Sequence, residues 1–156
     1  MEIKNVKIWV SSLLCIVLFS SDLPFYSKAS EANLTEIQAG KMAQSKGSIK
    51  VKNIAQQMVT DFTTAQADLV VASAKQGAKI SLVPDAQNQK ILDHLSKLSG
   101  NAFDSAYLKM ESMNHQFVIA LYKDEASAGS DPVAKAYAMK YLPTLQKQAK
   151  MIQASK

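Results

Sequence analysis

The stretch that decides the fold runs from Leu98 to Tyr122 and reads LSGNAFDSAYLKMESMNHQFVIALY. Its mostly apolar residues recur at steps of three and four, which is the spacing of one face of an α-helix. This line consists of Phe103, Ala106, Tyr107, Met110, Asn114, Phe117 and Leu121. Continued from Asn101 to Ala128, the helix would be about 42 Å long at 1.5 Å per residue, a length that suits a helical bundle.

A second line of residues runs beside the first on the same predicted helix. It consists of Asp104, Leu108, Glu111, His115, Val118 and Tyr122. Because this flank is partly apolar as well, we expect the helix to be covered on more than one side. The same line holds the ionisable side chains of this stretch that could carry chemistry.

The rest of the chain predicts further helices and no strands. Residues 49–76 show a regular apolar seam that follows Ser48, a residue able to cap a helix start. Shorter helices are predicted over residues 30–45 and 85–98, and a last helix begins at Asp131-Pro132. The sequence therefore predicts an all-α, up-and-down helical bundle formed by a single domain over residues 30–156.

Residues 1–29 are interpreted as a secretory signal peptide. Lys4 and Lys7 precede an apolar run from Ile8 to Phe19, and Ser27-Lys28-Ala29 offers small residues for a cleavage site. The alternative is that the segment stays uncleaved as a membrane anchor. We expect an exported protein that is periplasmic, associated with the outer membrane, or secreted.

Composition narrows the possible functions. The one cysteine, Cys15, lies in the predicted signal, so the mature chain would have no disulfide, thiolate metal site or cysteine nucleophile. The formal net charge is +5, carried by dispersed lysines without any arginine. This pattern is typical of a solvated surface and not of nucleic-acid binding. A protein or envelope partner is expected, and its identity and the oligomeric state stay open.

Candidate metal ligands lie on three of the predicted helices. Glu111 and His115 are one turn apart on one face, and Asp61 lies at the rim of the seam of residues 49–76. Glu36 and Asp104 are further candidates. Carboxylate oxygens and imidazole nitrogens bind first-row transition metals. The alternative is that Glu111 and His115 form an ordinary side-chain pair on the helix surface.

A copper site is a separate possibility, because thioethers and imidazole suit soft metals. Met110, Met113 and His115 would supply the ligands. At 100° per residue, however, Met113 and His115 point about 200° apart. Methionines in such a stripe are more commonly core residues.

Several phrases resemble a known family. They are AQQMVTD (55–61), LSGNAFDSAY (98–107), NHQFVIALY (114–122), DPVAKAYA (131–138) and YLPTLQ (141–146). Their order and spacing are similar to the ferritin-like family of secreted bacterial proteins named domain of unknown function 4142, often labelled outer membrane proteins. The resemblance implies an exported helical bundle. Members usually carry histidines where this chain has Phe62 and Gln148, and an aspartate where it has Asn114.

Three functions follow for testing. The first is an exported, non-enzymatic bundle with an interaction or stress-related role, the latter by analogy with the family. The second is a metal-binding protein that uses Asp61, Glu111 and His115. The third is a di-metal redox enzyme, which would need carboxylates and nitrogen ligands from several helices. Because this chain lacks two of the family histidines, we expect no stoichiometric di-metal centre, and a metal ion is the one cofactor considered.

Overall fold

A computed structural model describes residues 23–155 and places five α-helices in them. They are α1 (Leu23–Lys46), α2 (Ile49–Lys75), α3 (Ala86–Ser96), α4 (Gly100–Ala128) and α5 (Pro132–Gln153). This part of the chain contains no strand. The prediction of an all-α bundle is confirmed.

Short polar side chains fix where the helices begin. Asp85 and Asp131 accept hydrogen bonds from the backbone N–H groups of Asn88 and Val133, at 2.7 and 2.8 Å. Ser48 caps α2 in the same way. Such caps satisfy N–H groups that have no partner inside the helix. The predicted starts of these three helices are therefore confirmed.

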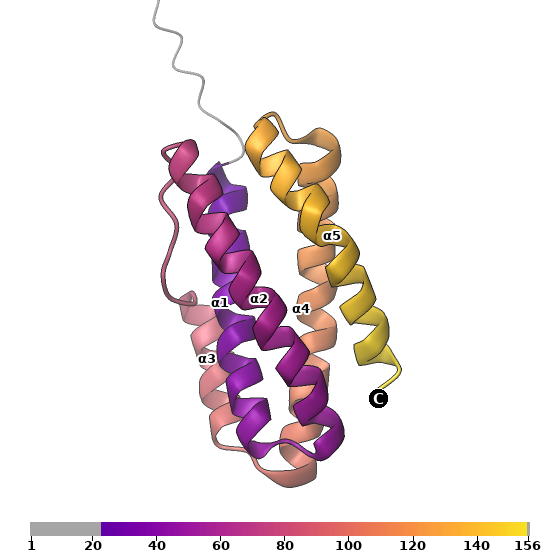
Figure 1. Cartoon of the computed structure of the whole chain (residues 1–156). Coiled ribbons are helices and arrows are strands. Elements are labelled where there is room, and N and C mark those ends of the chain that lie inside the picture. The colour runs from indigo at the N-terminus through magenta and orange to yellow at the C-terminus, as the bar shows by residue number, and fades with distance from the viewer. Residues whose placement is uncertain (1–22, 156) are drawn as a thin grey trace, which may run out of the picture.

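The helices form two antiparallel hairpins, α1 with α2 and α4 with α5 (Figure 1). The loop after α2 and helix α3 run back along the bundle, so α2 and α4 point in the same direction (Figure 1). The starts of α2 and α4 lie side by side, because the Ser48 N–H at the start of α2 donates to Asp104 Oδ1 in the first turns of α4 at 3.1 Å. Successive helices from α1 to α5 thus alternate in direction, as the predicted up-and-down order requires, and α3 belongs to the crossover that makes the long helices α2 and α4 parallel (Figure 1).

Two apolar clusters fill the bundle. The larger one spans α1, α2, α4 and α5, and Phe25, Met58, Tyr122 and Leu145 are among its members. The smaller one lies nearer the α1–α2 turn and includes Val51, Leu95, Phe103 and Met110. On α4, Met110 belongs to one cluster and Val118 to the other. The intervening turns of α4 hold Glu111 and His115, so a polar layer interrupts the buried face of this helix between the two clusters.

The buried face of α4 differs from the one expected. Beyond Met110 it follows the second line of residues, through Glu111, His115, Val118 and Tyr122. Phe117 was expected in the core, but it is 52% exposed. Because α4 packs against α5 on one side and α1 on the other, its inward side is centred between those two neighbours.

Helix α1 begins seven residues before the start predicted for the mature chain. It starts at Leu23, and Phe25, Tyr26 and Ala29 are buried within it. The charged and apolar parts of the predicted signal lie outside the described residues. Within residues 23–155, the helices lack the sustained hydrophobicity that a bilayer-spanning segment needs.

Candidate metal centre

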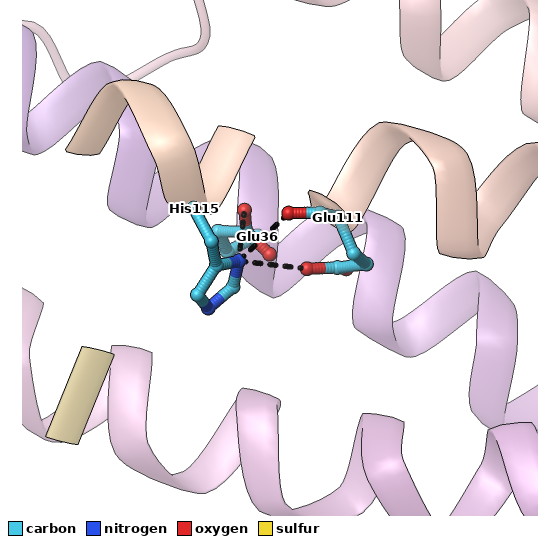
Figure 2. Close-up of side chains that lie close together, drawn as sticks. All are labelled: Glu36, Glu111 and His115. Atoms are coloured by element: carbon cyan, nitrogen blue, oxygen red, sulfur yellow. Dashed lines mark hydrogen bonds and ion pairs between the residues drawn. The ribbon is translucent and has the colours of Figure 1, made fainter. Parts of the chain in front are cut away.

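Three ionisable side chains from two helices meet in the polar layer. Glu36 comes from α1, and Glu111 and His115 come from α4 (Figure 2). One ligand atom from each of them lies within 4.8 Å of the other two. The side chains are 0%, 0% and 1% exposed, respectively. Two helices thus bring two carboxyl groups and one imidazole together out of contact with solvent.

The imidazole presents its Nδ1 atom to both carboxyl groups (Figure 2). Nδ1 lies 3.5 Å from Glu111 Oε2 and 4.0 Å from Glu36 Oε1. It also lies 2.9 Å from the backbone carbonyl oxygen of Glu111. The i,i+4 spacing of Glu111 and His115 places both side chains on the same side of α4.

Most of the carboxyl oxygens in this group accept no hydrogen bond. Glu36 Oε1 accepts from Asn114 Nδ2 at 2.7 Å. Glu36 Oε2 and both carboxyl oxygens of Glu111 have no hydrogen-bond partner within the described part of the chain. Buried polar atoms are normally paired, and an exception calls for an explanation such as a bound ion or water.

Electrostatics disfavours two negative charges here without a cation. Burial raises the pKa of Glu111 well above its usual range, and the charge of Glu36 raises it further. Burial also raises the pKa of the Tyr107 hydroxyl, with smaller contributions from the charges of Glu111 and Glu36. Both shifts have the same meaning: a further negative charge is costly at this point, mainly because the groups are buried and in part because the carboxylates repel one another.

A second group of polar residues contacts the other side of the His115 ring. His115 Nε2 lies 3.1 Å from Gln148 Oε1 of α5. Gln148 Nε2 donates to Asp61 Oδ2 of α2 at 2.8 Å. Phe62 packs edge-on against the imidazole, with ring centroids 5.9 Å apart. All four long helices therefore contribute a side chain to the surroundings of His115.

The structure separates the residues that the sequence suggested as ligands. It brings Glu36 together with Glu111 and His115, whereas Asp61 reaches His115 only through Gln148. Asp104 lies at the end of the bundle, where its carboxylate accepts from the Ser48 N–H. Of the expected candidates, the structure thus groups Glu36, and not Asp61 or Asp104, with Glu111 and His115.

The copper set is not assembled either. Met113 is 63% exposed, on the opposite side of α4 from His115. The sequence did not indicate a supporting role in the site for Tyr107, Asn114 and Gln148. Tyr107 precedes Glu111 by four residues, so its place on the same face was available from spacing alone. Gln148 comes from α5, and its approach to His115 depends on tertiary packing.

These observations define a helical bundle with a buried carboxylate–histidine cluster. The family model described as Domain of unknown function (DUF4142) matches residues 18–154. The chain therefore belongs to this family. No functionally curated protein and no experimentally solved structure matches it.

Proposed function

We propose that this protein binds a single divalent transition-metal ion between Glu36, Glu111 and His115. The observation that carries the proposal is that three carboxyl oxygens of this fully buried group lack hydrogen-bond partners within the described residues. The imidazole Nδ1 atom lies 3.5 Å from one of them, Glu111 Oε2, and 4.0 Å from Glu36 Oε1, the oxygen that accepts from Asn114. Metal–ligand bonds of about 2.0–2.2 Å would draw these atoms together by a small movement of the side chains.

Charge balance supports the same proposal. Two ionised glutamates and a neutral imidazole carry two negative charges, which a divalent cation neutralises. In the metal-free protein the raised pKa of Glu111 favours its protonated form, and a bound cation would favour the ionised form. One nitrogen and two carboxylate donors suit Mn²⁺, Fe²⁺ or Zn²⁺ better than a soft ion such as Cu⁺.

Metal content of protein purified without an affinity tag tests the proposal. The protein is incubated separately with Mn²⁺, Fe²⁺ and Zn²⁺, desalted, and measured by elemental analysis. We expect one retained ion per chain for at least one of these metals. The Glu111→Gln and Glu36→Gln variants should retain none, because an amide is a weaker ligand and carries no charge.

Two matched controls keep the test specific. Asp104→Asn changes a carboxylate that lies on α4, like Glu111, and accepts from the Ser48 N–H, and His94→Gln changes the exposed histidine of α3. Both variants should retain the ion. A helical wild-type protein that retains no ion would refute the proposal and favour the interaction bundle. Two ions per chain would refute it in favour of a di-metal centre.

We also propose that the bundle is exported and acts in the bacterial envelope or outside the cell. The support is the sequence of residues 1–22, with Lys4, Lys7 and the apolar run from Ile8 to Phe19. Cell fractionation tests this proposal, with the N-terminal residue determined by mass spectrometry. Full-length chain found only in the cytoplasm would refute it.

A further inference from the structure

We propose that a pocket between α2 and α5 binds one small hydrogen-bond donor, a water molecule or an ammonium ion, at the side-chain oxygen of Asn33. All four long helices line this pocket, and Asn33, Asp61, Ala65, Tyr122 and Tyr141 are among the lining residues. Its volume is about 10 Å³, which is the space that one water-sized group needs. The metal ligands proposed above do not line the pocket, so the inference stands apart from the proposed function.

A chain of hydrogen bonds between α1, α2 and the loop after α2 fixes the orientation of the Asn33 amide. The Ser30 hydroxyl donates its hydrogen to the backbone carbonyl of Ser81 at 2.7 Å, and that carbonyl can only accept. Ser30 Oγ must therefore accept from Gln66 Nε2, which lies 2.8 Å away. Gln66 Oε1 then faces Asn33 at 3.1 Å, so Asn33 presents its NH₂ group on that side.

A second contact requires the same orientation of this amide. The Tyr137 hydroxyl donates to the backbone carbonyl of Ala65 at 3.1 Å, so its oxygen accepts from Asn33 Nδ2 at 3.3 Å. Asn33 Oδ1 is therefore turned away from both Gln66 and Tyr137. On α5 the pocket lining begins at Tyr141, one turn after Tyr137, which places the pocket on the side of the amide that bears Oδ1. Asn33 is fully buried, and its Oδ1 has no hydrogen-bond partner in the described part of the chain.

Two further lining residues also offer acceptor atoms. Asp61 has a carboxylate, which accepts from Gln57 and Gln148 at 2.8 Å and keeps further lone pairs. The Tyr122 hydroxyl gives its hydrogen to Tyr137, so the lone pairs of its oxygen remain. A ligand that satisfies these atoms must therefore donate hydrogen bonds.

Size and charge narrow the class of this ligand. The volume admits about one non-hydrogen atom, and water and ammonium both meet this limit. The negative charge of Asp61 favours ammonium, because opposite charges attract more strongly in a partly buried site than in bulk water. Water supplies the same kind of donor without the charge. Potassium has the charge of ammonium and no hydrogen to donate, and these few side chains do not supply a full shell of oxygen ligands for it.

Thermal melts of the metal-free protein in ammonium chloride and in potassium chloride, at equal ionic strength, test for the ion. We expect Tm in ammonium to rise above Tm in potassium, with the logarithm of the concentration, because a ligand that binds only the folded state stabilises it by mass action. Asp61→Asn should lose this shift. Asp93→Asn is the matched control and should keep it: Asp93 accepts from Gln89 four residues before it, as Asp61 does from Gln57, but lies exposed on α3.

Nuclear Overhauser effects between water and the Asn33 side-chain amide test for a bound water molecule. Asn33→Leu removes the acceptor, and Ala65→Val fills the pocket while leaving the hydrogen bonds of Asn33 in place, so both variants should lose whichever signal the wild type gives. An ammonium-dependent shift identifies the ion, and a water contact without that shift identifies water. Neither signal in the wild type, an equal effect of potassium, or a signal that survives in a folded Ala65→Val variant would overturn the inference.

Discussion

A chain that begins at Ser30 should fail to fold stably, whereas a chain that begins at Asp22 should fold. Helix α1 starts at Leu23, and the Phe25 and Tyr26 side chains are only 3% and 0% exposed. Phe25 packs edge-on against Tyr122, with ring centroids 5.3 Å apart. The first turns of α1 are thus part of the same core as α4.

The size of the effect follows from what the shorter chain loses. Truncation of a buried aromatic side chain costs about 3–5 kcal/mol, so loss of Phe25 and Tyr26 would cost about 6–10 kcal/mol. The Tyr26 hydroxyl also donates to Asp131 Oδ2 at 2.6 Å, at the start of α5. The total stability of a domain is about 5–15 kcal/mol, so the loss is comparable with the whole.

Urea unfolding monitored by circular dichroism compares the two chains. The chain from Asp22 should unfold cooperatively, and the chain from Ser30 should show little or no folded baseline. Phe25→Ala in the longer chain is an intermediate case, with an expected loss of about 3–5 kcal/mol. If the two chains differ by less than about 1 kcal/mol, the reasoning is refuted. The expected result would place any signal cleavage before Leu23, and not after Ala29.

Three further predictions concern single residues. Phe117→Ala should lower the free energy of unfolding in urea by less than about 1 kcal/mol, because Phe117 is half exposed. Phe103→Ala should lower it by about 3–5 kcal/mol, because Phe103 is buried. Similar losses of stability in the two variants would contradict the observed burial. Because burial raises the pKa of Glu111 in the folded state, the metal-free wild type should lose stability as pH rises through that pKa. Thermal melts of Glu111→Gln should not show this loss of stability. Parallel pH profiles of the two proteins would argue against a buried carboxyl group. Asp104→Ala should cost about 1 kcal/mol by removing the acceptor of the Ser48 N–H at the start of α2, and it should leave the metal content unchanged. Loss of metal in elemental analysis would contradict the placement of Asp104 away from the cluster.

The helix starts could be predicted because their signals are local. Ser48, Asp85 and Asp131 each precede an apolar periodic segment, and each accepts a hydrogen bond from an N–H group two or three residues ahead. Such a cap needs no partner from elsewhere in the chain. The start of α1 had no comparable signal, and the pattern of a cleavage site at Ser27-Lys28-Ala29 competed with it.

The buried face of α4 could be predicted only as far as Met110. After that residue, apolar side chains occur on both flanks of the helix, and hydrophobicity alone predicts that Phe117 is buried and His115 is exposed. The positions of α1 and α5 decide between the flanks, and these positions are tertiary information. The same limit explains the candidate site: the i,i+4 pair of Glu111 and His115 was visible, whereas Glu36 had to be brought in by the packing of α1 against α4.

The polar layer formed by Glu36, Glu111 and His115 lies where apolar residues could be expected, so its presence needs an explanation. Replacing buried ionic groups with well-packed apolar residues is often neutral or stabilising by about 1–4 kcal/mol. Glu36, Glu111 and His115 lie between two apolar clusters that such residues could join, so stability alone gives little reason for them. Asn114 and Gln148 would also lose their hydrogen-bond partners if the cluster became apolar. A ligand therefore explains three ionisable groups in the core better than stability does, and the divalent cation proposed above would balance their charge.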